Sequence, residues 1–122
     1  MTAAIGIIST ILITLVALLH VYFLILEMVF WDKPLGLKTF RLTQEFATAS
    51  KALAANQGLY NGFLAAGLLW GLWLGPNGFS IKVFFLLCVI IAGLFGAATV
   101  GKKILIVQAL PAIIALAVLL AI

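Results

Sequence analysis

Long, nearly uninterrupted apolar runs constrain this chain more than any other feature of its sequence. A helix needs about 20 apolar residues to cross a hydrocarbon core of about 30 Å. Inside lipid every backbone polar group must be bonded, which leaves only helices and closed barrels. Four runs reach the required length, and strand-like alternation is absent. They cover about residues 3–30, 52–74, 81–100 and 104–122. We therefore predict an all-α fold, a membrane-embedded four-helix bundle.

The composition supports the same conclusion. Of the 122 residues, 66% are hydrophobic and 8% are charged, whereas soluble domains are about one-half apolar and one-quarter charged. A chain this short cannot bury so much apolar surface in a core of its own. No linker or repeat divides it, so we predict one transmembrane domain over residues 1–122. The first run has no preceding basic residue and is too long for a signal peptide, so we expect it to stay in the membrane.

Several classes of protein are excluded by what the sequence lacks. The single cysteine, Cys88, cannot form an internal disulfide and does not suit a thiol oxidoreductase. The net charge is +4, but the basic residues form no dense stripe, so we expect no nucleic-acid partner. No metal-ligand cluster, nucleotide loop or nucleophile motif is present. We accordingly predict neither a metal nor a cofactor.

The connections between the runs differ in character. Residues 31–51 mix charged and apolar side chains, which is typical of a segment in the headgroup layer. Thr43 is a plausible N-cap, so the second helix is predicted to begin there and to extend beyond the bilayer. The sequence Gly-Pro-Asn-Gly at 75–78 predicts a tight turn.

The basic residues predict an orientation. Basic loops favour the cytoplasmic side of a membrane. Only Lys82 lies near the second connection. The first and third connections hold Lys33, Lys38, Arg41, Lys51, Lys102 and Lys103. We therefore predict a multi-pass protein of the cytoplasmic membrane, with the lipid bilayer as its surroundings and both termini outside.

Two ionisable residues interrupt the first apolar run. His20 and Glu27 are seven positions apart and lie on one helical stripe, which Trp31 continues. An ionisable group in hydrocarbon costs several kcal/mol, so it normally faces a partner or a cavity. Each residue also has a purely structural interpretation. Glu27 could pair with a loop Lys or Arg, and His20 could form an inter-helix hydrogen bond.

The second run carries the densest group of polar residues, within an arc of about 140°. The group consists of Asn56, Gln57, Tyr60 and Asn61. Gly58, Gly62 and Ala66 continue beside it as a ridge that allows close helix packing. Because Asn56 and Tyr60, like Gln57 and Asn61, are four positions apart, hydrogen bonds within the helix are the alternative reading.

Two further features bear on packing. Gly67, Gly71 and Gly75 form a second small-residue series, which would suit a fourth helix or a second subunit in a homo-oligomer. In the last run Pro111 predicts a kink, with Gln108 beside the carbonyl that the proline leaves unbonded.

The position of each polar residue along its predicted helix, combined with the predicted orientation, places most of these residues in the cytoplasmic half of the membrane. We predict one polar pocket, open toward the cytoplasm. The candidate ligand-binding or proton-handling residues are His20, Glu27, Asn56, Gln57, Tyr60, Asn61 and Gln108.

Two stretches, His20 to Trp31 and Lys51 to Ala65, resemble a family of small bacterial membrane proteins catalogued as domain of unknown function 1304. Residues 93–99 and 108–112 also resemble its later helices. The resemblance covers nearly the whole chain and implies a four-helix membrane protein, but it implies no activity.

Hypotheses from different classes remain. The leading one is binding or transport of a small or lipid-like molecule, with Glu27 or His20 changing protonation as it binds or moves. The alternative is a membrane-embedded enzyme of isomerase or hydratase type, with His20 and Glu27 as acid and base. A non-catalytic role as a partner subunit is the third.

Overall fold

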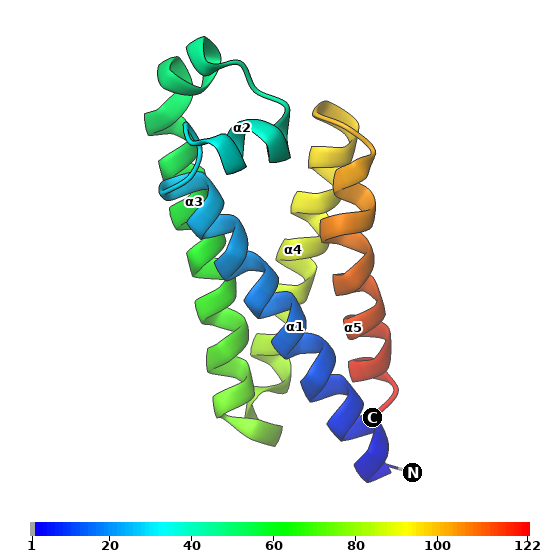
Figure 1. The fold of residues 1–122 in the computed structure, drawn as a ribbon. Coiled ribbons are helices and arrows are strands. Elements are labelled where there is room, and N and C mark those ends of the chain that lie inside the picture. Colours follow the sequence, from blue (N-terminus) through cyan, green and yellow to red (C-terminus); the bar gives the residue numbers. More distant parts are fainter. Residues whose placement is uncertain (1) are drawn as a thin grey trace. The chain divides into compact units, whose positions relative to one another are not determined.

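The protein is helical throughout the part that the structure, a computed structural model, describes, residues 2–122 (Figure 1). Helices take up 88% of the chain, and the described residues contain no strand, which confirms the all-α prediction. The α-helices are α1 (Thr2–Met28), α2 (Pro34–Phe40), α3 (Gln44–Trp73), α4 (Phe79–Thr99) and α5 (Leu110–Leu120).

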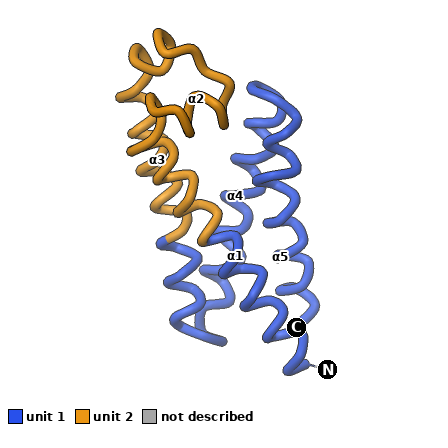
Figure 2. The backbone as a smooth tube through the Cα atoms, viewed as in Figure 1, with its two compact units in different colours: residues 1–17, 66–122 blue, residues 18–65 orange. Residues whose placement is uncertain are grey.

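Two compact units divide the chain (Figure 2). One comprises residues 18–65, which include the end of α1, all of α2 and nearly three-quarters of α3. The other comprises residues 1–17 and 66–122. The predicted single transmembrane domain stays a prediction.

In the 18–65 unit, α1 and α3 approach closely at the predicted glycine ridge. A Cβ atom on Gly58 would lie 2.7 Å from Met28 Cγ and 3.1 Å from Glu27 Cβ. A Cβ atom on Gly62 would lie 2.7 Å from Leu24 Cδ1. The absence of side chains at these two positions is therefore what lets the helices come together.

The connection between α1 and α3 contains a helix that was not predicted. Pro34 takes the first position of α2, where its missing N–H costs nothing. The helix ends at Phe40, and Arg41 after it has a left-handed φ of 54°. The backbone N–H of Leu42 then donates to the carbonyl oxygen of Leu37 at 2.9 Å, as in a Schellman cap.

The N-terminus of α3 lies where the capping chemistry placed it. The backbone N–H of Phe46 donates to Thr43 Oγ1 at 3.1 Å, which confirms Thr43 as the N-cap. The helix therefore begins at Gln44, eight residues before the apolar run predicted from about residue 52.

In the other unit, α3 and α4 are joined by the predicted tight turn, a 3₁₀ turn over Gly75–Gly78. Gly75 has a φ of 61°, which glycine adopts at no steric cost. Gly67 lies against the ring of Phe85, and a Cβ atom on Gly71 would lie 2.8 Å from Lys82 Cγ. The contacts of these two glycines are thus made by a helix of the same chain. An oligomer through this series stays a prediction.

The last helical segment is irregular where proline predicted a disturbance. A π-helical turn over Leu105–Ala109 precedes α5, and Leu110 donates its backbone N–H to the carbonyl oxygen of Leu105. The turn packs on α4, since a Cβ atom on Gly93 would lie 2.8 Å from Ala109 Cβ. The run predicted over 104–122 is therefore a wide turn followed by a short α-helix.

Candidate functional site

Glu27 lies in the last turn of α1 and is only 3% exposed. Gln57 Nε2 donates a hydrogen bond of 2.6 Å to Glu27 Oε2. Asn61 Nδ2 donates to the other carboxylate oxygen, Oε1. We refer to these three residues as the Glu27 cluster. Each oxygen of the buried carboxylate therefore has an amide donor of its own.

The local sequence explains how α3 supplies both donors. Gln57 and Asn61 are four positions apart, so their side chains leave the same face of the helix. Gly58 lies beside Gln57 and lets the backbone of α1 come close enough for short amide side chains to reach Glu27. The predicted alternative of hydrogen bonding within the helix does not describe this pair, because both amides donate to α1.

Asn56 and Tyr60 are not part of this cluster. Asn56 Nδ2 donates to Tyr60 Oη at 3.1 Å, which is the predicted bond within the helix. Both side chains are exposed. The four polar residues of α3 thus separate into one pair that holds Glu27 and one pair whose members bond each other.

His20 is completely buried, and its ring meets that of Phe23 edge to face at a centroid distance of 5.3 Å. His20 and Glu27 are seven positions apart, a rise of about 10 Å along α1. The two ionisable residues share a stripe as predicted, but they belong to different turns.

Gln108 lies in the π-helical turn and is half-buried. It belongs to the unit of residues 1–17 and 66–122, whereas the Glu27 cluster lies in the 18–65 unit. A pocket shared by all seven candidate residues therefore stays a prediction.

The loop beside the cluster contains contacts that the sequence did not reveal. Trp31 Nε1 donates to Ser50 Oγ at 3.0 Å, and the Trp31 ring packs on Phe40 with centroids 4.9 Å apart. Pro34 after a charged residue was a signal for the start of α2. No comparable signal pairs a tryptophan with a serine 19 positions away.

An ion pair also ties this loop to α3. Lys51 Nζ lies 3.1 Å from Asp32 Oδ2. The hydrogen bond from Lys51 is the main reason why the pKa of Asp32 lies below its ordinary value of 3.8. A loop lysine was predicted as an alternative partner for Glu27, but this lysine pairs with Asp32.

Comparison with known proteins gives the family. A family model described as "Protein of unknown function (DUF1304)" matches residues 14–120. The chain belongs to the DUF1304 family. This DUF1304 protein is 32% identical over 112 residues to "Uncharacterized protein YpaA" of Lactococcus lactis subsp. lactis (strain IL1403), covering 90% of this chain and 94% of that protein. No solved structure matches it. The resemblance of the sequence to the family is thereby confirmed, and the matched residues include the whole Glu27 cluster.

Proposed function

We propose that this DUF1304 protein is an integral membrane protein. Two helical segments, Thr2–Met28 and Gly75–Thr99, are long and apolar enough to cross a membrane, and Leu105–Leu120 is a shorter apolar helix. Only 22% and 17% of the most apolar windows of the two long segments are buried inside the protein. A core helix of a soluble protein would be mostly covered by its own chain. Lipid is therefore the solvent that suits these side chains.

We further propose four crossings of the cytoplasmic membrane, with both termini outside. The support is the placement of six of the seven basic residues on the first and third connections. The length of α3 fits this arrangement. Its 30 residues span about 45 Å, more than a hydrocarbon core of about 30 Å, so its first turns would project from the membrane.

The proposed function is to bind or transport a small or lipid-like molecule at the Glu27 cluster. A buried carboxylate in the last turn of an otherwise apolar helix, bonded by two amides of a second helix, is the observation that supports it. Ionisable residues in membrane helices usually mark a substrate or proton path, because burying them costs several kcal/mol. Gln57 is exposed and unbranched, so its amide can swing away and leave Glu27 Oε2 to a hydrogen-bond donor of the ligand.

The enzyme hypothesis receives less support from the same geometry. An acid and a base must both reach the reacting atoms. His20 and Glu27 differ in position by about 10 Å along α1, so a substrate would have to extend over two helical turns. If the protein were a partner subunit without a ligand, the hydrogen bonds from the Gln57 and Asn61 amides to Glu27 would have only a structural role.

The test compares wild type with Glu27→Gln and with a matched control, Glu45→Gln, which removes an exposed carboxylate at the start of α3. The three proteins are purified from the same membranes, and the small molecules that accompany them are identified by mass spectrometry. We expect a molecule that wild type and Glu45→Gln retain and that Glu27→Gln loses by roughly tenfold or more, since a hydrogen bond to a charged group contributes about 1.5–3 kcal/mol.

The molecule found is then the probe for flux in proteoliposomes containing wild type, Glu27→Gln or His20→Ala. Flux that depends on Glu27 supports transport, and retention without flux supports binding. Chemical conversion of the molecule by wild type would favour the enzyme hypothesis. Equal retention by wild type and Glu27→Gln would refute a ligand site at the cluster.

A further inference from the structure

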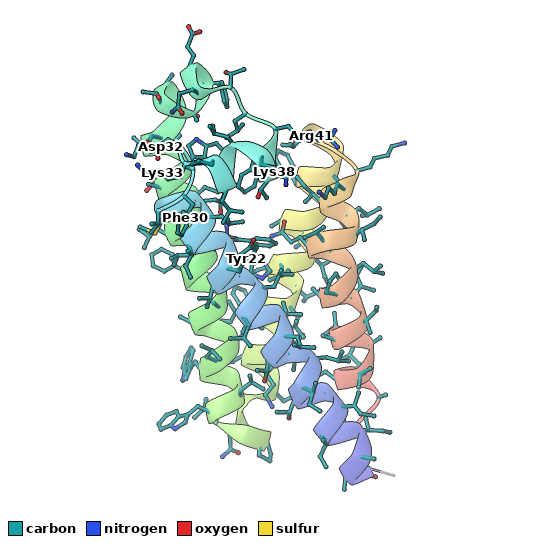
Figure 3. The ribbon with its side chains drawn as sticks, viewed as in Figure 1. Tyr22, Phe30, Asp32, Lys33, Lys38 and Arg41 are labelled. Carbon is teal, nitrogen blue, oxygen red and sulfur yellow. The ribbon has the colours of Figure 1, made fainter. Side chains whose placement is uncertain are left out.

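The loop after α1 presents three exposed basic side chains, Lys33, Lys38 and Arg41, which we name the loop basic surface (Figure 3). Apolar side chains of the same unit are exposed beside them in sequence. Leu35 is 44% exposed and Phe46 is 56% exposed. Alternating basic and apolar side chains fit the boundary between lipid headgroups and acyl chains.

The positive charge of this surface is only partly balanced by the protein. Asp32 forms its ion pair with Lys51 and is also influenced by the charge of Lys33. Within residues 2–122, the side chains of Lys38 and Arg41 form no hydrogen bond or ion pair. These two basic groups are therefore available to an external anion.

The backbone that carries these side chains is held in place. Gly36 is buried against the backbone carbonyl groups of Phe30 and Trp31, where a Cβ atom would not fit. The Trp31 ring packs on Phe40 and its Nε1 donates to Ser50. Arg41 has a left-handed conformation in which glycine is the usual residue. A basic residue thus occupies a position whose backbone conformation favours glycine, which has no side chain.

The loop must also lie near one end of α1. Met28 and Pro34 are six positions apart, so α2 begins within about 20 Å of the end of the apolar helix. We propose that the loop basic surface binds the headgroups of anionic phospholipids. This inference rests on the proposed membrane placement but not on any ligand at the Glu27 cluster. The cytoplasmic leaflet, where the basic loops are expected, carries such lipids.

The expected size of the effect follows from the charge. A basic side chain near an anionic membrane surface favours binding by about fivefold, so removing all three should lower the preference for anionic lipid by about a hundredfold. Exposed charges are screened, and raising the salt concentration should weaken the preference of wild type as well.

The experiment titrates the detergent-solubilised full chain with short-chain phosphatidylglycerol and, in parallel, phosphatidylcholine, and counts bound lipids by native mass spectrometry. Wild type is compared with Lys33→Gln/Lys38→Gln/Arg41→Gln. Two double variants with equal loss of charge, Lys33→Gln/Lys38→Gln and Lys102→Gln/Lys103→Gln, separate a local site from an effect of net charge. We expect the first double variant to lose about twentyfold in preference for phosphatidylglycerol, and the second, which leaves the loop basic surface intact, to lose less.

Three results would overturn the proposal: equal losses in the two double variants, a triple variant that still prefers phosphatidylglycerol, or displacement of the lipid by inorganic phosphate or polyglutamate at equal charge concentration. The last would indicate a site for a soluble anion or an acidic protein. Incorporation of wild type and the triple variant into phosphatidylcholine nanodiscs tests the membrane placement separately, because that lipid has no net charge. Failure of wild type to incorporate would contradict the placement itself.

Discussion

At the scale of single residues, Glu27 is bonded by neutral amides, one to each carboxylate oxygen. An amide NH2 group donates to an ionised carboxylate, but a protonated carboxyl group is itself a donor and needs an acceptor. Protonation of Glu27 would therefore require Gln57 or Asn61 to turn its amide oxygen toward the carboxyl group. The cluster thus couples the charge of Glu27 to the orientation of two side chains on α3.

Asp32 gives a prediction for pH. Its pKa in the folded protein is lowered below 3.8, chiefly by the hydrogen bond from Lys51. A lowered pKa means that the contribution to stability is present above pH 3.8 and is lost as the pH falls through the folded-state pKa. In a Trp70→Phe/Trp73→Phe background, we expect the emission of the adjacent Trp31 to change on acidification with a midpoint below 3.8, and Lys51→Gln to raise that midpoint toward 3.8.

Lys38→Gln is the control for this titration, because it removes an exposed positive charge that has no ion pair with Asp32. Its midpoint should match that of wild type. If Lys51→Gln titrated at the same pH as wild type, the ion pair would not be the cause of the lowered pKa.

At the scale of elements, the approach of α1 to α3 depends on Gly58 more than on Gly62. A Cβ atom at position 58 would meet Glu27 Cβ at 3.1 Å and the Leu24 carbonyl oxygen at 3.2 Å, and neither atom can move without the backbone of α1. A Cβ atom at position 62 would meet only Leu24 Cδ1, the end of a flexible side chain. Replacing Gly58 would therefore force the backbone of α1 to move, whereas replacing Gly62 would displace only the Leu24 side chain.

We expect Gly58→Ala to lower the free energy of unfolding by about 1–3 kcal/mol, the usual cost of overpacking. Gly62→Ala should change it by less than about 1 kcal/mol, because a rotamer change of Leu24 relieves the contact and alanine favours a helix by about 1 kcal/mol over glycine. Denaturant titration in detergent measures both. Gly6→Ala, where no atom lies within 4 Å of the new Cβ, is the control and should not destabilise. Equal decreases in the free energy of unfolding for Gly58→Ala and Gly62→Ala would contradict this geometry.

The sequence predicted those parts of the elements that depend on local chemistry. Thr43 as a cap, the turn at Gly75–Gly78 and the disturbance before Pro111 follow from hydrogen-bonding rules of a few residues. The helix α2 was missed because seven residues are too few for helical periodicity to be recognised.

The composition of the site was predicted only in part, for a geometric reason. Four polar residues within an arc of about 140° on one helix do not show which edge of the arc faces a neighbouring helix. The rotation of α3 is fixed by Gly58, and it turns Gln57 and Asn61 toward Glu27 and leaves Asn56 and Tyr60 exposed. The pairing of Trp31 with Ser50 depends on the same tertiary contact, which no local pattern encodes.

At the scale of the whole molecule, the proposed topology can be tested with single cysteines in a Cys88→Ser background. Ala49 in the first turns of α3 and Asn77 in the turn between α3 and α4 are both exposed. We expect a membrane-impermeant maleimide to label Asn77→Cys in intact cells and to label Ala49→Cys only after the membrane is opened. Labelling of both from outside, or of Ala49→Cys alone, would contradict the proposed orientation.

The π-helical turn over Leu105–Ala109 has a consequence for numbering along the last helix. A π turn closes on the fifth residue where an α turn closes on the fourth, so it holds one residue more than a regular helix needs. Deleting a single residue there could restore α-helical bonding without breaking the helix. The hydrogen bond from Leu110 to Leu105 would then close over four positions instead of five, so the side chains on the two sides of the deletion would keep their relative directions. In this part of the chain the turn absorbs a change in length of one residue, so relatives that differ here by one residue would present the same face of α5.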